Sequence, residues 1–285
     1  MRHPPVSPGP RPAPARPPAL VAVAHGSTNP RAAAAVADLM ALTAARAARA
    51  GLPGLLVRAA FLGHALPRLP DVLEALDGRP AAAGPAGPRG RRAAVVLPLL
   101  LTGAYHSDTD LPEVLREACG RLPGLRISYG HPLGPHTGLL RALDRRLSEA
   151  MASAGMTGPP ADTAVVLAAA GSSRPAANAA VARVAADWHK ARGWRAVVPA
   201  YASAGSPGPG QAVAGLLRDG APRVVVATYL LAPGVFADQI RGQALAAGAG
   251  AVSAPLGAVP ELADVILERY REAAQVGVGD RRQYA

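Results

Sequence analysis

Five histidines lie between residues 20 and 150, where their side chains could do metal and proton chemistry. Neutral imidazole binds divalent transition metals such as Fe²⁺ and Co²⁺ well, and the same ring can exchange protons near neutral pH. Histidines gathered in one crevice could therefore hold a metal ion and take up protons from its acceptor. The five are His25, His64, His106, His131 and His136.

The numbers of cysteines and lysines exclude several kinds of metal and nucleotide site. Cys119 is the only cysteine, which excludes an internal disulfide, a cysteine-based zinc site and an iron–sulfur cluster held by this chain alone. Lys190 is the only lysine and is followed by Ala191, so the chain has no P-loop with which to hydrolyse ATP. A metal site here must use nitrogen or oxygen ligands.

The elements that position these residues follow an α/β pattern. Beyond residue 19, short Val/Ala/Leu runs alternate with Ala-rich stretches of helical length, which predicts parallel four-stranded sheets flanked by helices. The predicted strands are Leu20–Ala24, Leu56–Phe61, Ala93–Leu97, Leu125–Tyr129, Ala164–Ala168, Ala196–Tyr201, Arg223–Thr228 and Gly250–Ala254. The predicted helices are Arg31–Ala50, Leu69–Leu76, Asp110–Cys119, Leu139–Ala150, Ala176–Ala191, Gln211–Leu217, Ala237–Ala246 and Glu261–Ala274.

The two halves resemble each other as an internal duplication. Residues 24–30 laid on residues 169–175 keep Gly, Ser and Pro in step, and residues 95–101 fall on residues 225–231. Pro132-Leu133-Gly134 recurs as Pro255-Leu256-Gly257. The predicted organisation is a disordered Pro/Arg-rich extension over 1–19, a first domain over 20–150, a linker over 151–163, a second domain over 164–275 and a tail over 276–285.

The histidines are where the two copies differ. His25 corresponds to Ala170, His106 to Phe236, and His64 falls near Ala204. A duplication that keeps its turns but carries imidazoles at these positions in one half alone indicates that this half performs the chemistry. His25 and His106 each follow a predicted strand, and the carboxyl ends of parallel strands are where such folds bind ligands. We therefore expect both rings to face one crevice.

Two residues beside His25 are further candidates for ligand binding. Ser27 lies in the turn after the first strand, where backbone N–H groups and a helix N-terminus favour anions. Arg31, just inside the following helix, could hold a carboxylate of the ligand, although a solvated surface arginine is the simpler interpretation. Asp108 and Asp110 could orient the ring of His106, but Asp110 is equally well explained as a helix cap.

Charge and composition limit the partners. The formal net charge is +11 among 285 residues, which favours anionic ligands. The chain has only two Phe and two Trp to stack bases, so we expect no nucleic-acid binding. No apolar run approaches the roughly 20 residues that cross a bilayer, and the first 18 residues lack the apolar centre of a secretory signal. We therefore expect a cytoplasmic protein with no membrane partner.

The motifs identify a family resemblance. Val23-Ala24-His25-Gly26-Ser27, then Pro98-Leu99-Leu100-Leu101 with Gly103-Ala104-Tyr105-His106, then Leu133-Gly134-Pro135-His136, resemble the class II-type chelatases of the sirohydrochlorin chelatase family, in their two-repeat form. The resemblance runs from Leu20 to about Ala274. It implies two tandem chelatase-like domains facing each other across a cleft, and ATP-independent insertion of Co²⁺ or Fe²⁺ into sirohydrochlorin.

The same resemblance assigns roles to residues. It makes His25 and His106 the catalytic, metal-binding pair. Many relatives carry an acidic residue after the second strand, whereas this chain reads Phe61-Leu62-Gly63-His64, so His64 is a candidate to take its place. His136 is a further candidate for binding the tetrapyrrole, or else lies at the start of the last helix of its half.

Two alternatives stay open at the level of sequence. A histidine phosphatase also has a histidine in the turn after its first strand, but the preceding arginine that would hold phosphate is Ala24 here. A carrier that binds a tetrapyrrole or a metal without inserting it would need the same ligands. The duplication suggests that a monomer has both walls of the cleft, and a homodimer is the other option.

Overall fold

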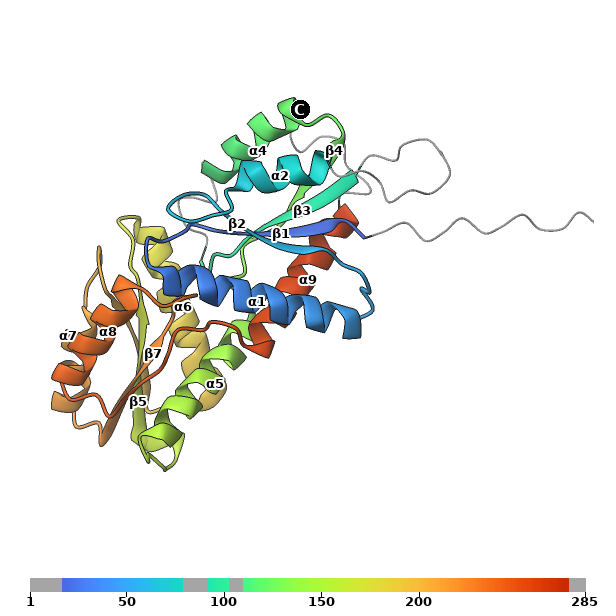
Figure 1. The fold of residues 1–285 in the computed structure, drawn as a ribbon. Helices are drawn as coiled ribbons and strands as arrows, with labels where there is room; N and C mark the ends of the chain where they lie inside the picture. Colours follow the sequence, from blue (N-terminus) through green and yellow to red (C-terminus); the bar gives the residue numbers. More distant parts are fainter. Residues whose placement is uncertain (1–16, 79–91, 103–109, 277–285) are drawn as a thin grey trace, which may run out of the picture.

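The computed structural model describes residues 17–78, 92–102 and 110–276, which form two parallel four-stranded sheets with helices on both faces (Figure 1). The strand order is β2-β1-β3-β4 in the first sheet and β6-β5-β7-β8 in the second, and every pairing is parallel. The predicted α/β fold with two equivalent sheets is confirmed.

The order of elements is the same in the two repeats, with one short 3₁₀ turn, Pro160–Asp162, between them. The first repeat comprises β1 (Ala19–Ala24), α1 (Pro30–Arg49), β2 (Val57–Phe61), α2 (Leu69–Gly78), β3 (Arg92–Pro98), α4 (Asp110–Arg121), β4 (Leu125–Tyr129) and α5 (Thr137–Ser153). The second comprises β5 (Thr163–Ala169), α6 (Pro175–Arg192), β6 (Ala196–Tyr201), α7 (Pro209–Arg218), β7 (Arg223–Thr228), α8 (Val235–Ala246), β8 (Ala251–Val252) and α9 (Pro260–Val276).

Local sequence signals start and stop the helices that border the site. Asn29 caps α1, because its side chain accepts a hydrogen bond from the N–H of Arg31, and Pro30 supplies a helical φ at the first position. In the second repeat α6 also begins with a proline, Pro175. It ends at Gly193, whose left-handed conformation few other residues adopt without strain.

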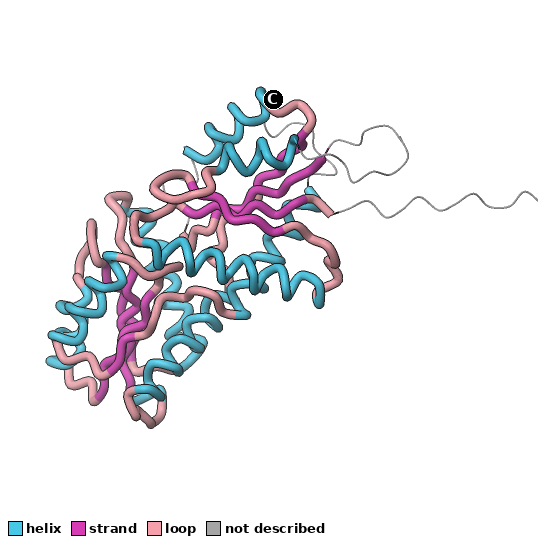
Figure 2. The backbone as a smooth tube through the Cα atoms, in the orientation of Figure 1, coloured by secondary structure: helices cyan, strands magenta, loops and turns pink. Residues whose placement is uncertain are grey.

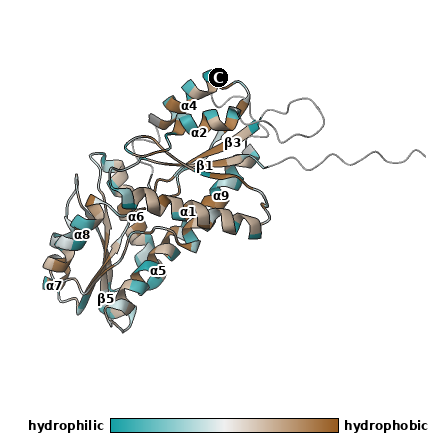
Figure 3. Ribbon diagram, viewed as in Figure 1, coloured by the Kyte–Doolittle hydropathy of each residue, from teal (hydrophilic) through white to brown (hydrophobic). Residues whose placement is uncertain are grey.

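Both faces of the sheets are buried, which explains why their strands read as continuous apolar runs. Alternate residues of β1 and β5 point into one shared core between the two sheets, where α1, α5, α6 and α9 lie (Figures 1 and 2). The outer face of the first sheet packs on α2 and α4, and that of the second on α7 and α8. The apolar colouring of the strands in Figure 3 follows this layering.

The last helix of each repeat packs on the sheet of the other repeat. α5 belongs to the first repeat in sequence, yet it contacts β7 and β8 of the second sheet. α9 closes the second repeat in sequence and contacts β3 and β4 of the first sheet, as well as α1 and α5. α5 also runs on to Ser153, into the segment from which the sequence predicts a linker. The exchange joins both sheets through a single hydrophobic core.

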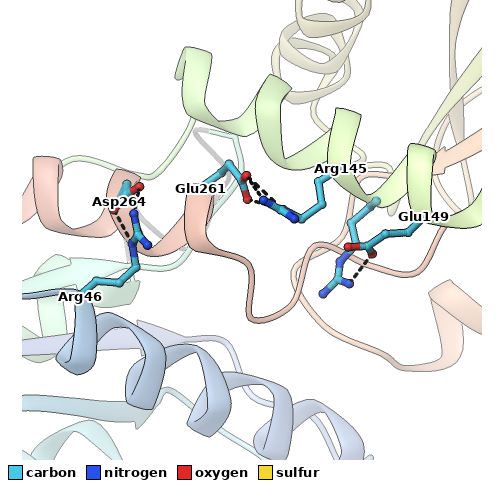
Figure 4. A network of polar contacts seen from close by, with 6 residues as sticks. Arg46, Arg145, Glu149, Glu261 and Asp264 are labelled. Carbon is cyan, nitrogen blue, oxygen red and sulfur yellow. Dashed lines mark hydrogen bonds and ion pairs between the residues drawn. The ribbon is translucent and has the colours of Figure 1, made fainter.

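Ion pairs that join α9 to α1 and to α5 support this packing (Figure 4). Arg46 on α1 holds Asp264 on α9 in a two-pronged contact, with Nε–Oδ1 at 2.6 Å. Arg145 on α5 holds Glu261 on α9 in the same way, with Nη2–Oε1 at 2.7 Å. The hydrogen bond from Arg145 lowers the pKa of the Glu261 carboxyl below its usual range.

We therefore expect Glu261→Gln to destabilise the protein at neutral pH and to matter less in acid. Because the folded-state pKa of Glu261 is depressed, its contribution is present above the pKa of an unfolded glutamate and is lost as pH falls through the folded value. Urea unfolding from about pH 7 to pH 3 measures the difference. Glu272→Gln is the control, because the ion pair that the structure describes for Glu272 is with Arg269 on the same helix. A deficit for Glu261→Gln that stays constant over this range would contradict the assignment.

Among the described residues, no helix has both the length and the apolar composition needed to cross a membrane.

Candidate functional site

A cavity of about 630 Å³ lies where the carboxyl ends of the two sheets meet. The strand order reverses between β1 and β3 in the first sheet and between β5 and β7 in the second, and such reversal points are where open α/β sheets bind ligands. The walls carry the residues that follow each of these four strands. They are His25 and Ser27 after β1, Leu99–Thr102 after β3, Ala170–Ser172 after β5, and Tyr229–Phe236 after β7.

The turn after β1 is held tightly against the loop after β2. Gly26 has φ +96°, and a Cβ atom at this position would lie 1.7 Å from the carbonyl oxygen of Gly63. The N–H of Gly63 in turn donates a hydrogen bond of 3.0 Å to the carbonyl of His25. Only glycine permits this approach, which fixes where the side chains on both loops begin.

This contact brings His25 and His64 together. Their ring centroids are 6.2 Å apart and the planes are tilted by 57°. His64 has φ +58°, an uncommon conformation for a residue with a side chain. His25 is exposed and lines the cavity, while His64 stands beside it on the adjacent loop. The two predicted residues thus form a pair of imidazoles at the rim of the cavity.

Ser27 and Arg31 follow His25 along the chain, and of these two only Ser27 is among the residues that line the cavity. Ser27 lines it, and its Oγ accepts a hydrogen bond of 3.1 Å from the N–H of Asn29. Arg31 reaches across to the second repeat, where its Nη2 lies 2.7 Å from Oδ2 of Asp238 on the first turn of α8. Both side chains of this pair are more than half exposed. The arginine therefore already holds a carboxylate beside the cavity.

His136 lies away from these residues and makes structural contacts. Its Nδ1 accepts a hydrogen bond of 3.0 Å from the N–H of Gly138, which makes it the N-cap of α5. Its Nε2 lies 3.0 Å from a carboxylate oxygen of Glu268 on α9. With both ring nitrogens engaged, His136 links the exchanged helices, which agrees with the alternative that places it at a helix start.

The other predicted metal-site histidine, His106, falls within residues 103–109, outside the described residues, as does Asp108. Its place beside His25 stays a prediction. In the ranges that the structure describes, no group of three or more His, Cys, Asp or Glu side chains is arranged to hold a metal ion. His25, which lines the cavity, and His64 beside it are the two predicted site histidines that the described residues bring together.

A sequence profile of the CbiX family matches residues 19–150 and, a second time, residues 164–273. The chain belongs to the CbiX family. Its resemblance to the sirohydrochlorin chelatases is thereby confirmed at the level of the family, and the two matched segments correspond to the two sheet-forming repeats of the fold.

Named relatives of this CbiX-family chain are chelatases. It is 29% identical over 146 residues to a sirohydrochlorin cobaltochelatase of Priestia megaterium, covering 51% of this chain but only about half, 47%, of that protein. It is 28% identical over 184 residues to a sirohydrochlorin ferrochelatase of Bacillus subtilis strain 168, covering 63% and 68% of the two chains. The solved structure of SirB from Bacillus subtilis with Fe³⁺ has a TM-score of 0.73 and 25% identity, with 94% and 98% covered.

The second CbiX repeat keeps the backbone of the site without its imidazoles. Gly171 has φ +85°, and a Cβ atom there would lie 1.8 Å from the carbonyl oxygen of Ser203. The N–H of Ser203 donates to the carbonyl of Ala170, and Ala204 has a positive φ as His64 does. This geometry agrees with the predicted correspondence of His25 with Ala170 and of His64 with Ala204.

Sequence reasoning missed two polar residues of the second repeat that shape the cavity. Tyr229 is buried, and its hydroxyl donates a hydrogen bond of 2.9 Å to the carbonyl of Leu101, joining the ends of β7 and β3. Burial raises the pKa of Tyr229, so the hydroxyl keeps its proton. Asn178 donates to the carbonyls of Ser172 and Ala204. In the alignment of the two repeats Tyr229 corresponds to Leu99. A tyrosine at a position that is apolar in the other repeat was the sequence signal for this residue.

Proposed function

We propose that this chain inserts a divalent metal ion, Co²⁺ or Fe²⁺, into sirohydrochlorin, in the cavity between its two repeats. The observation that carries the proposal is His25, exposed at the joined carboxyl ends of two CbiX repeats and bordering a cavity of about 630 Å³. A cavity of this size accommodates a cofactor-sized ligand. The names of the relatives from Priestia megaterium and Bacillus subtilis support the same substrate.

For this reaction the protein has to supply ligands for the metal ion and bases that accept the pyrrole protons. The incoming ion loses part of its water, two pyrrole N–H protons leave the macrocycle, and bonds from the ring nitrogens to the metal replace them without a change of oxidation state. His25 serves as a metal ligand, with His106 as its proposed partner. His64, whose ring centroid lies 6.2 Å from that of His25, is placed to accept a departing proton. No ATP and no iron–sulfur cluster takes part.

Substrate orientation comes from charge at the edge of the cavity. Sirohydrochlorin carries several carboxylates, and Arg31 already holds the carboxylate of Asp238 at 2.7 Å. One substrate carboxylate takes the place of Asp238, with Ser27 beside it. Because one chain supplies both walls, a monomer suffices for the reaction, and the cytoplasm, where such pathways run, is the proposed location.

A turnover assay distinguishes insertion from carriage. Protein at catalytic concentration is mixed with sirohydrochlorin and Co²⁺ or Fe²⁺, and the absorbance of the macrocycle is followed. An enzyme converts many equivalents faster than the uncatalysed reaction, whereas a carrier gives a spectral change that stops at one equivalent. The stoichiometric result would overturn the proposal. When Co²⁺ and Fe²⁺ compete in the same assay, the ratio of the two products shows which ion the protein prefers.

We expect Asp238→Asn to lower the KM for sirohydrochlorin. The substitution frees Arg31 and removes a negative charge that repels the substrate carboxylates, so KM falls by about twofold to fivefold at low salt, an effect that salt weakens. Steady-state kinetics at two ionic strengths measure it. Asp219→Asn makes the same change of charge on an exposed residue after α7 and should leave KM unaltered. A KM that does not respond to Asp238→Asn would argue against Arg31 as the carboxylate-binding residue.

A further inference from the structure

The first turn of α8 exposes two adjacent apolar side chains to the cavity. Val235 is 75% exposed and Phe236 is 42% exposed, and both line the cavity that His25 borders. Among the described residues the other large exposed hydrophobic side chains, Leu66, Leu217 and Leu245, are not among those that line it. An aromatic ring left exposed inside a ligand-sized cavity is most simply explained by a ligand that covers it.

A contact between the repeats holds this turn close to the end of the first repeat that carries His25. Asp238, two residues beyond Phe236, is bonded to Arg31 on the first turn of α1 at 2.7 Å. α1 follows directly on the turn that carries His25. Phe236 and His25 therefore approach the cavity from different repeats, at the end where the two repeats are tied together.

The internal repeat gives Phe236 a defined position. The N–H of Leu99 donates to the carbonyl of Val23 at 2.7 Å, and the N–H of Tyr229 donates to the carbonyl of Ala168 at the same distance, so Leu99 and Tyr229 are equivalent. Counting forward equally from these two residues gives His106 and Phe236. The second repeat thus carries an aromatic hydrocarbon where the first carries an imidazole.

We propose that Phe236, flanked by Val235, is the apolar platform against which the macrocycle of the substrate packs, opposite the imidazole of His25. This inference rests on the proposed function and extends it by naming a residue that recognises the substrate. A tetrapyrrole has a flat, conjugated centre with carboxylates at its edge. Phe236 contacts the centre, while Arg31 holds the edge. The first repeat then binds metal, and the second repeat binds the macrocycle.

The test separates macrocycle binding from metal binding. The affinity for sirohydrochlorin without metal is measured by absorbance titration, and the affinity for Co²⁺ without macrocycle by calorimetry. Phe236→Ala should weaken sirohydrochlorin binding by about tenfold, since a lost aromatic contact of this kind is worth one order of magnitude in affinity. Phe236→Trp should restore it to within about twofold. Neither variant should change the affinity for Co²⁺.

Leu245→Ala is the matched control, because Leu245 lies on the same helix with a similar exposure, 44%, outside this cavity. Unchanged sirohydrochlorin affinity in Phe236→Ala, with a wild type that binds and turns over the macrocycle, would overturn this inference alone. A wild type that neither binds nor metallates sirohydrochlorin would instead overturn the proposed function. A change of sedimentation coefficient in Phe236→Ala, with macrocycle affinity intact, would overturn the inference by showing that the platform contacts a second copy of the chain.

Discussion

His25→Ala should abolish metal insertion while leaving the fold intact. His25 is the described imidazole that lines the cavity, so its loss removes a metal ligand at the point where the macrocycle is presented. We expect kcat/KM for Co²⁺ insertion to fall by about 10³-fold or more, at the scale of losing a central acid–base or ligand group. Because the side chain is exposed, the free energy of unfolding should change by less than about 0.5 kcal/mol.

Two other histidine variants serve as comparisons for His25→Ala. His189→Ala changes an exposed histidine on α6 of the second repeat and should leave turnover unchanged. His64→Ala removes the neighbouring ring and should lower kcat by about 10- to 100-fold with less effect on metal affinity, as expected for a base beside the ligand. Comparable turnover in His25→Ala and wild type would remove His25 from the mechanism.

Gly26→Ala should strongly destabilise the protein. The new Cβ atom would lie 1.7 Å from the carbonyl oxygen of Gly63, on a backbone with φ +96° that L-residues rarely adopt. The loops after β1 and β2 would have to separate, breaking the hydrogen bond between Gly63 and His25. We expect a loss of about 3 kcal/mol or more in the free energy of unfolding, measured in urea.

Matched glycines separate the clash from the conformational strain. Gly51 has φ +78°, but a Cβ atom added there would meet nothing within 4 Å, so Gly51→Ala should cost only about 1 kcal/mol. Gly171→Ala repeats the clash in the second repeat, where the distance is 1.8 Å to Ser203, and should match Gly26→Ala. Equal stabilities for the Gly26 and Gly51 variants would show that the two loops part at little cost.

The elements of the fold could be predicted because the sheets are buried on both faces. Apolar strand runs separated by helical stretches identified the strands, and the bounds agree within a few residues. The differences have local causes. α1 begins at Pro30 because Asn29 supplies the cap. β8 is only Ala251–Val252, shorter than the predicted Gly250–Ala254, because only these two residues pair in register with β7.

The exchange of α5 and α9 could not be predicted from the sequence. Periodicity shows that a helix has an apolar face but not which sheet receives it. Both helices carry suitable faces, and the choice is made by contacts between residues far apart in the chain. Examples are Arg46 with Asp264 and Arg145 with Glu261. The sequence order therefore predicted that each helix packs on the sheet of its own repeat. In the structure each helix packs on the sheet of the other repeat.

The site was predictable in part for similar reasons. The position of His25 at a strand end followed from the alternation of strands and helices. The comparison of the repeats indicated a function, because the second repeat has alanine at the equivalent position. The contact between His25 and His64 depends on a close approach at Gly26 that no spacing rule gives. His136 matched the family motif, yet its Nδ1 caps α5 at Gly138. Its Nε2 contacts Glu268 because α9 of the other repeat packs there.

An anomalous difference map from crystals of the protein soaked in Co²⁺ would show whether His25 binds the metal. We predict a cobalt peak in the cavity between the repeats, within about 2.1 Å of a ring nitrogen of His25, the usual length of a bond from imidazole to such a metal. Cobalt bound only elsewhere, or an empty cavity under saturating metal, would contradict this role of His25.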